Sequence, residues 1–360
     1  MVMHDEQQQH IGRGAVSNPA GRFELKQVVT VDDGWKQEDE VLPPLVTTVQ
    51  PDASRSIITR NDSPDVPFTQ SINPYRGCEH GCIYCFARPT HAYFNLSPGL
   101  DFETKLFYKP DAAKLLEAEL AKSTYRCQTI ALGTNTDPYQ PIEREYRVMR
   151  GILEVLHACN HPVSIVTKGS LIERDIDLLS AMAKKRLASV AISVTTLRND
   201  LKRTLEPRAA SPGARLRVIK SLTDAGVPVT VMVAPVIPLL TDGELEHILE
   251  AAVDAGAKHA GYLVVRLPHE VKQLFRDWLN AHEPLKASHI MSLLNQMRGG
   301  RDNDPRFGTR QTGEGIYAEL LAKRFAGACQ RLGLNRGERY LLDTKQFMPP
   351  VIEGTQLSLW

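Results

Sequence analysis

Cys78-Glu79-His80-Gly81-Cys82-Ile83-Tyr84-Cys85 places three thiols close together, with three residues and then two residues between them. This spacing lets three thiolates converge on one point, and the small Gly77 and Gly81 allow the backbone to wrap closely around it. Three ligands rather than four indicate a site that keeps a position open for a substrate or a cofactor. The strands and helices predicted on either side of this loop indicate how it is placed in the fold.

Zinc is the alternative occupant of the loop, with His80 or His91 as a fourth ligand. Structural zinc sites usually draw their ligands from two well-separated pairs, which this sequence lacks. The other cysteines, Cys127, Cys159 and Cys329, lie singly in apolar surroundings. Such usage is typical of a reducing compartment, so we expect the protein to be cytoplasmic.

Around the loop, strand-like runs alternate with helical patterns. Residues 70–75 predict a strand that leads into the loop, and 102–108 also alternates like a strand. After these, the strand-like runs are 129–132, 163–167, 189–194, 229–234 and 261–265. Strands that alternate with helices at this spacing indicate a parallel sheet with helices outside it. About six such units, fewer than the eight of a full barrel, predict an α/β fold of the TIM-like, partial (β/α)6 type.

Three regions are expected along the chain. Residues 1–67 are rich in polar residues, Pro, Gly and Asp, and predict an extended N-terminal arm that is partly disordered. Residues 68–268 form the barrel. Residues 269–360 predict a helical C-terminal extension with a free tail, and helical patterns occur at 270–279, 291–297 and 316–332.

The overall charge gives no sign of a general attraction to nucleic acid. The chain of 360 residues carries 43 Lys and Arg against 42 Asp and Glu, so any such binding must be local. The longest apolar run, 227–240, is interrupted by Pro228, Pro235 and Pro238, and the N-terminus is polar. We therefore expect neither a membrane span nor a signal peptide.

The cysteine loop resembles the cluster-binding motif of the radical S-adenosylmethionine (SAM) enzymes. In that superfamily, cysteines spaced C-x3-C-x2-C bind a [4Fe-4S] cluster and an aromatic residue commonly precedes the last one, as Tyr84 does beside Cys78, Cys82 and Cys85. The resemblance implies that the fourth iron binds SAM, that an electron from the cluster breaks a carbon–sulfur bond, and that a 5′-deoxyadenosyl radical takes hydrogen from the substrate. It also implies a reductant partner such as flavodoxin or ferredoxin.

The C-terminal ends of the predicted strands carry further cofactor contacts, because active sites of βα barrels lie at these ends. After the second barrel strand, oxygens of Thr134, Asn135 and Asp137 suit the place where the superfamily binds the methionyl amine. A capped turn is the alternative, since Thr, Asn and Asp also form turns.

The next strand ends contribute three more candidates. Ser193 ends the fourth strand, where related enzymes contact the ribose hydroxyls. Lys168, after the third strand, and Arg208 are candidates to neutralise the methionyl carboxylate or to bind substrate, with an ordinary surface position as the alternative. No residue is assigned a catalytic role beyond these contacts.

Within the superfamily, residues 68–268 most resemble the spore photoproduct lyase group, described as DNA repair photolyase-like. The true lyase has a hydrogen-donating cysteine where this chain has Thr134, and Cys127 lies at the other end of that strand. Reversal of thymine dimers by that relay is therefore not expected. Two outer stretches, 12–19 and 306–310, resemble a branch of the group whose members are mostly uncharacterised.

Two features suggest a nucleic-acid setting. Arg298, Arg301, Arg306 and Arg310 lie in one Gly-rich stretch that is suited to a phosphate backbone, although a solvated charged loop is the alternative. The C-terminal Gln356-Leu357-Ser358-Leu359-Trp360 resembles the short motif by which bacterial proteins dock on the DNA polymerase sliding clamp, with packing on its own domain as the alternative.

These observations favour a radical SAM enzyme that acts on DNA or another nucleic-acid component, in repair or modification. The same chemistry on a peptide or small metabolite is the first alternative. A metal-stabilised accessory protein of the sliding clamp, without enzymatic activity, is the second.

Overall fold

The structure, a computed structural model, describes residues 12–24, 45–337 and 340–351. Within these residues a seven-stranded sheet has the order β10-β9-β8-β7-β6-β3-β2. All neighbours from β3 to β10 are parallel, and β2 joins β3 antiparallel, so the predicted partial (β/α)6 barrel is confirmed. The strands are β2 (Ile58–Arg60), β3 (Gln70–Ile72), β6 (Ile130–Leu132), β7 (Val163–Thr167), β8 (Ala188–Ser193), β9 (Val229–Val236) and β10 (His259–Val264).

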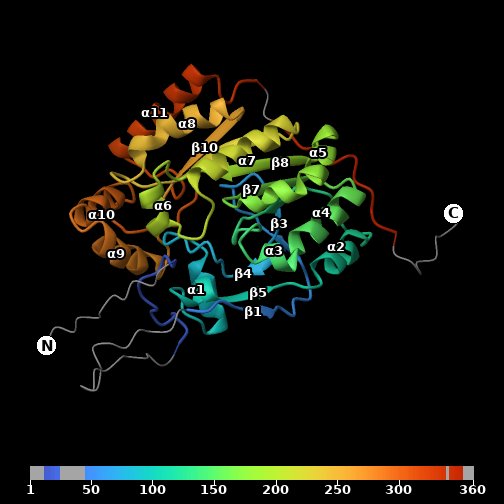
Figure 1. Cartoon of the computed structure of the whole chain (residues 1–360), viewed down its shortest axis with the longest axis horizontal. Helices are drawn as coiled ribbons and strands as arrows, with labels where there is room; N and C mark the ends of the chain where they lie inside the picture. The colour runs from blue at the N-terminus through green and yellow to red at the C-terminus, as the bar shows by residue number, and fades with distance from the viewer. Residues whose placement is uncertain (1–11, 25–44, 338–339, 352–360) are drawn as a thin grey trace.

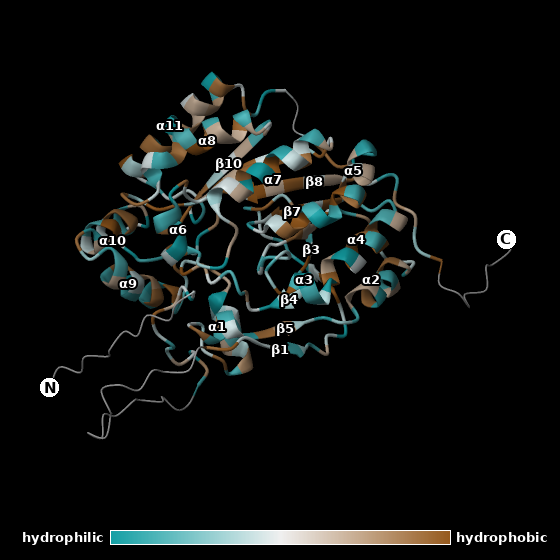
Figure 2. Cartoon of the chain, viewed as in Figure 1, coloured by the Kyte–Doolittle hydropathy of each residue, from teal (hydrophilic) through white to brown (hydrophobic). Residues whose placement is uncertain are grey.

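Helices follow the strands and pack outside them (Figure 1). All of them except the short α3 bury apolar residues toward the core, and Figure 2 shows the strand β8 as largely apolar while the helices carry both kinds of residue. These helices are α2 (Ala112–Leu120), α3 (Glu143–Tyr146), α4 (Val148–Ala158), α5 (Ile176–Lys184), α6 (Asn199–Leu205), α7 (Pro212–Asp224) and α8 (Leu245–Asp254).

Local sequence explains where these helices begin and end. Ser211 caps α7, its hydroxyl accepting a hydrogen bond of 3.2 Å from the amide of Ala214, and Pro212 occupies the first turn. Gly226 and Gly256 follow α7 and α8 with φ of +78° and +101°, a conformation that a residue with a Cβ rarely adopts. Each turn returns the chain directly to the next barrel strand.

A second, three-stranded sheet lies beside the barrel, in the order β1-β5-β4 among the described residues. Its strands are β1 (Thr48–Pro51), β4 (Tyr75–Arg76) and β5 (Lys105–Tyr108). The predicted strand over 102–108 is wrong in its first half, because α1 (Asp101–Thr104) buries Phe102, Glu103 and Thr104 together. The predicted strand 70–75 is divided between β3 and β4, since Pro74 cannot donate to a ladder.

The C-terminal extension is helical where predicted, with α9 (Val271–His282), α10 (Ala287–Gln296) and α11 (Ile316–Leu332). Arg324 of α11 binds Glu246 of α8 at 2.6 Å. The N-terminal arm supplies β1 and β2 to the two sheets, so the division at residue 67 stays a prediction. None of the helices in the described ranges combines the length and apolar character needed to cross a bilayer.

Candidate active site

The cysteine loop begins directly after β4 and is held by main-chain hydrogen bonds. The amide of Cys78 donates to the carbonyl of Phe102 at 2.9 Å, and the amide of Ile83 donates to the carbonyl of Leu205 at 3.1 Å. Gly81 has a φ of +66°, and a Cβ there would lie 2.7 Å from Glu103 Oε2. The loop therefore needs glycine at this position both for its backbone conformation and for space.

A buried ion pair holds the cysteine loop through hydrogen bonds to its main chain. Arg88, fully buried at the start of the 3-10 helix η1 (Arg88–Phe94), pairs with the equally buried Glu103 of α1. The Arg88 guanidinium also donates to the carbonyl oxygens of Cys82 at 2.9 Å and Gly81 at 3.1 Å. Each donor of this cation thus meets an oxygen, which offsets the cost of removing the charge from water.

The N-terminal segment closes over the same carboxylate. The amides of Gly14 and Ala15 donate to Glu103 at 3.0 and 2.9 Å, and the Arg13 guanidinium donates to the Glu103 carbonyl at 3.1 Å. A Cβ at Gly14 would lie 1.8 Å from the Gly81 carbonyl oxygen, so this segment approaches the loop as only glycine can. The stretch 12–19, which stood out in the sequence, therefore packs against the cysteine loop through its residues 13–15.

The three thiols are largely removed from solvent. Cys78 and Cys82 are buried and Cys85 is half-buried. Burial and then the charge of Asp137 raise the pKa of the Cys78 thiol, and burial followed by Glu206 raises the pKa of Cys82 to about 12. Bound iron would offset this penalty, because a coordinated thiol is deprotonated by the metal charge. Three sulfur donors on one enclosed loop fit the three protein ligands of an open [4Fe-4S] cluster.

The histidines proposed as a fourth zinc ligand are directed elsewhere. His80 Nδ1 lies 3.4 Å from Asp137 Oδ2, and His91 Nε2 lies 2.8 Å from the carbonyl oxygen of Lys105. In the ranges that the structure describes, no three His, Cys, Asp or Glu side chains are arranged to hold a single metal ion.

The other predicted site residues lie at the C-terminal ends of the parallel strands, on the side of the cysteine loop. Thr134 and Asn135 follow β6, Lys168 follows β7, and Ser193 ends β8. Among the described residues, the side chains of Thr134, Asn135 and Ser193 make no hydrogen bond, so their polar atoms remain available. The Lys168 ammonium lies 5.7 Å from the centre of the Tyr84 ring. Parallel strands bring these ends together because all of them point the same way.

The carboxylate of Asp137 is hydrogen-bonded to other residues of the protein. Its carboxylate accepts hydrogen bonds from the Thr167 hydroxyl at 2.6 Å, from the Lys168 amide at 2.7 Å and from the Tyr139 amide at 2.9 Å. Burial by itself would raise the pKa of Asp137, but His80 and these hydrogen bonds outweigh it and lower the pKa to about 2. The carboxylate is ionised and joins the loop after β6 to the end of β7.

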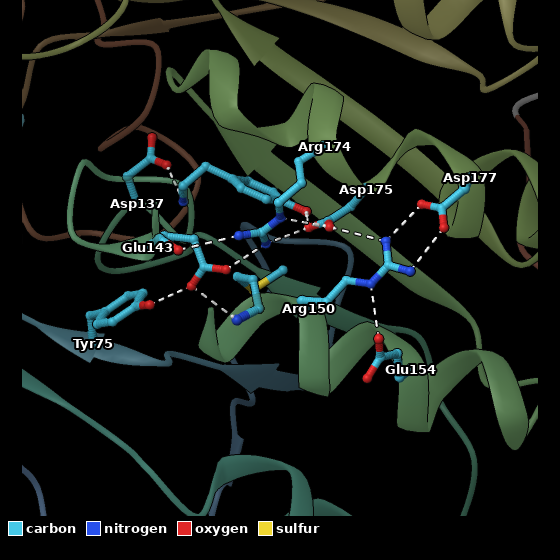
Figure 3. A network of polar contacts seen from close by, with 10 residues as sticks. Tyr75, Asp137, Glu143, Arg150, Glu154, Arg174, Asp175 and Asp177 are labelled. Carbon is cyan, nitrogen blue, oxygen red and sulfur yellow. Dashed lines mark hydrogen bonds and ion pairs between the residues drawn. The ribbon is translucent and has the colours of Figure 1, made fainter. Parts of the chain in front are cut away.

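A larger network anchors this loop to the strand before the cysteines (Figure 3). The Tyr75 hydroxyl of β4 donates to Glu143, which also binds Arg174 at 2.6 Å. Arg174 lies in the 3-10 helix η2 (Ser170–Asp175) and binds Asp175 at 2.8 Å, and the Tyr139 hydroxyl donates to Asp175 at 3.1 Å. The loops after β4, β6 and β7 are thus parts of one hydrogen-bonded unit.

A second buried network was missed in the sequence. Glu206 accepts hydrogen bonds from the Tyr84 hydroxyl and from Thr195 Oγ1, the latter at 2.7 Å, and it pairs with Arg215 of α7. Burial alone would raise the pKa of Glu206, but Arg215 and then Lys168 lower it to about 2. These residues were hidden because Glu206 follows α6 and Arg215 lies on a helix, away from any strand end. Together they orient the Tyr84 ring beside Cys85.

Arg208 and the C-terminal tail are placed differently from the strand-end residues. The Arg208 side chain is 38% exposed and pairs with Glu79 at 3.3 Å, at the outer edge of the cysteine loop.

The predicted clamp motif, residues 356–360, lies outside the described residues. Cys127 precedes β6 whereas Thr134 follows it, so the half-buried Cys127 thiol is at the opposite end of the barrel from the cysteine loop.

The sequence model of the radical SAM superfamily matches residues 72–252. The chain belongs to this superfamily.

An uncharacterised protein of Mycobacterium tuberculosis is 42% identical over 233 residues, which cover 64% of this chain and 68% of that protein. An uncharacterised protein of Methanocaldococcus jannaschii is 28% identical over 173 residues, covering 48% of this chain and 62% of that protein. A spore photoproduct lyase with bound AdoMet and dinucleoside spore photoproduct has the same fold, with a TM-score of 0.57 at 15% identity over 79% of this chain and 80% of that chain.

Proposed function

We propose that this radical SAM enzyme binds a [4Fe-4S] cluster through Cys78, Cys82 and Cys85, cleaves SAM reductively and abstracts hydrogen from a nucleic-acid component. The observation that carries the proposal is the enclosed three-thiol loop at the C-terminal ends of six parallel strands. When bound, the cluster and SAM supply an electron and a carbon-centred radical strong enough to remove hydrogen from carbon.

The residues around the loop bind and orient the cofactor. Thr134, Asn135 and Ser193 offer polar side-chain groups at the strand ends that make no hydrogen bond to any described residue. Lys168, half-buried beside Tyr84, supplies a positive charge for the methionyl carboxylate, and burial, which lowers the pKa of this amine, is outweighed by Cys82 and Glu206. Such placement keeps the cofactor oriented and the site screened from water.

Asp137 and Arg208 act on the cofactor less directly. All the hydrogen bonds to the Asp137 carboxylate come from the protein, so it positions the Lys168 main chain and His80. Arg208 pairs with the carboxylate of Glu79, whose amide donates a hydrogen bond to Gln140 Oε1 at 2.9 Å, and so holds the outer edge of the loop. Both remain near enough to the thiols to influence cofactor binding through the residues they hold.

The chemistry is tested by anaerobic reconstitution with iron and sulfide, followed by reduction with dithionite in the presence of SAM. We expect 5′-deoxyadenosine, measured by liquid chromatography and mass spectrometry. We also expect about four iron atoms per chain, as in one [4Fe-4S] cluster. Zinc in place of iron, with no 5′-deoxyadenosine, would remove the proposal.

The substrate is tested separately with deuterium. Transfer of deuterium from labelled DNA into 5′-deoxyadenosine or SAM is expected. Transfer from labelled peptide or metabolite fractions, with none from DNA or nucleotides, would replace the nucleic-acid substrate by the alternative class.

A further inference from the structure

Arg266 stands out at the C-terminal end of the barrel because no carboxylate of the described residues contacts its guanidinium. It follows β10 by two residues, at the C-terminal end of the last barrel strand. Its guanidinium makes no hydrogen bond or ion pair with any residue that the structure describes, although the side chain is half-buried. A partly desolvated guanidinium without oxygen partners is costly unless a ligand supplies them.

The guanidinium lies on an exposed aromatic ring next to the cysteine loop. Arg266 Cζ is 4.8 Å from the centre of the Phe86 ring, and Phe86 directly follows Cys85. The Phe86 side chain remains 44% exposed. This distance is within the range of a cation–π contact, and such a contact leaves the N–H groups of a guanidinium able to bind an acceptor.

Two further arginines surround Arg266 and add to the unbalanced charge. Arg298 is buried, donates to the carbonyl oxygens of Val265, Thr309 and Arg310 at 2.9, 3.0 and 2.8 Å, and has an unpartnered Nε. Burial and then Arg266 lower the pKa of Arg298 to about 10, and burial and then Arg310 lower the pKa of Arg266. Arg266 is therefore repelled by both neighbouring guanidinium groups, and the charge of Asp65 opposes this effect only in part.

Only one of these cations has a carboxylate in contact, among the described residues. Arg310 pairs with Asp65 of the N-terminal arm. Arg310 also stacks on Phe307, with Cζ at 4.7 Å from the ring centre, and Phe307 is 58% exposed. The cluster Arg266, Arg298 and Arg310 thus keeps a positive excess between two exposed rings, which favours an anion that adjoins a flat group.

We propose that Arg266 binds a phosphate of the substrate and that Phe86 and Phe307 stack against the adjoining bases. This inference rests on the proposed function and specifies its substrate as a nucleotide unit in a single strand. Arginine binds phosphate by two parallel hydrogen bonds, and aromatic rings accept any base by stacking. Phe86 adjoins Cys85, so a base held there lies beside the cofactor.

Arg266 differs from the arginines of the Gly-rich stretch. Arg306 pairs with Asp304 at 2.7 Å and with Glu314, Arg310 pairs with Asp65, and Arg298 is buried against carbonyl groups. Arg301 is exposed, whereas Arg266 is the half-buried guanidinium that has no hydrogen-bond acceptor among the described residues.

Fluorescence anisotropy tests the inference with a labelled single-stranded DNA oligomer and the reconstituted full-length protein. Arg266→Gln is expected to weaken binding about tenfold or more and to reduce the slope of log affinity against log salt by about 0.7, as for one lost phosphate contact. Phe86→Leu should also weaken binding by fivefold or more, as expected for one lost stacked base. Arg217→Gln, the same charge change at an exposed position of α7, is the control and should leave both quantities unchanged.

Competition distinguishes the sources of phosphate. Unlabelled oligomer should displace the probe best, a mononucleotide less well, and inorganic phosphate or an acidic peptide of equal charge least. Equal binding by the Arg266→Gln and Arg217→Gln variants would overturn the inference, and so would better competition by the acidic peptide. Arg266→Lys keeps the charge without the planar fork, and should fall between wild type and Arg266→Gln.

The two proposals fail in different ways. Absence of 5′-deoxyadenosine from the wild-type protein defeats the proposed function whatever the oligomer binds. Production of 5′-deoxyadenosine, with oligomer binding that does not depend on Arg266, defeats the inference alone. Melting temperatures of all variants show whether a weaker affinity merely reflects unfolding.

Discussion

The two ends of the barrel differ in the kind of polar group that they bury. At the mouth, the end where the parallel strands terminate and the cysteine loop lies, charged side chains are buried in pairs, such as Arg88 with Glu103 and Arg215 with Glu206. At the other end, the Tyr125 hydroxyl joins Gln70 Oε1 and His161 Nε2, each at 2.7 Å, in a chain of uncharged groups.

The difference follows from what each end has to do. Burying a charge is costly, and a buried pair is often no more stable than apolar residues of the same size. The mouth retains its charges because they hold the cysteine loop and direct Tyr84 and Lys168. The opposite end only has to close the barrel, and neutral hydrogen bonds suffice for that. Buried ion pairs therefore distinguish the end of the barrel that holds the cysteine loop.

The largest expected difference between the two ends is in activity. Replacing Cys78, Cys82 or Cys85 by Ala should abolish 5′-deoxyadenosine formation, since each removes one of the three cluster ligands. Cys127→Ala, at the opposite end, should leave the product yield unchanged. Product yield and iron content of the reconstituted variants measure this. A Cys82→Ala variant that still forms the product would contradict the assignment of the loop.

The next effect is on stability at the mouth. Glu103→Ala leaves the Arg88 charge buried without its carboxylate and removes the acceptor of the Gly14 and Ala15 amides, so the free energy of unfolding should fall by about 3–5 kcal/mol. Urea denaturation measures it.

The control for this change is Asp224→Ala, which breaks an exposed pair with Lys220 and should cost about 0.5 kcal/mol or less. Equal losses in the two variants would show that the buried pair does not stabilise the loop.

The smallest effect is a pH dependence at the opposite end. His161 Nδ1 lies 3.0 Å from the Pro162 carbonyl oxygen, and burial lowers the pKa of this histidine to about 4. In the unfolded chain, His161 becomes protonated near pH 6.5. In the folded protein it stays neutral until the pH falls to about 4. The contribution of neutral His161 is therefore complete above pH 6.5 and is lost as the pH falls, by about 2 kcal/mol between pH 6.5 and 5.

Urea denaturation of wild type and His161→Gln at pH 6.5 and 5 measures this contribution. The variant should be less stable at pH 6.5 but should lose less stability on acidification. The same loss in both proteins would assign the pH dependence to other groups.

Prediction from the sequence succeeded where short-range pattern and tertiary placement agree. The run 163–167 coincides with β7, because alternating Val, Ile and Thr suit a strand buried on one face. Prediction failed at Phe102 and Glu103, whose apolar and polar alternation indicated a strand although they form α1. Glu103 is helical because its carboxylate must reach Arg88 and the Gly14 amide, which are distant in sequence.

The candidate site shows the same division. The thiols and the strand-end residues could be found because barrel geometry brings all strand ends together. Glu206 could not, because a glutamate after a helix has no pattern that distinguishes it from surface residues, and Arg266, although it follows a predicted strand, has no local pattern that shows whether a carboxylate pairs with it. Their importance comes from the groups that folding places beside them, Tyr84 for one and Phe86 for the other.

The sequence by itself determined the radical SAM loop and the six βα units that position it, because ligand spacing and hydrophobic periodicity are local properties of the chain. Only the tertiary structure decided which charges are paired and which are left free. Within the part of the chain that the structure describes, Arg306 and Arg310 pair with carboxylates and Arg266 does not. Such pairing depends on distances between segments far apart in the chain, and these distances exist only after the chain has folded.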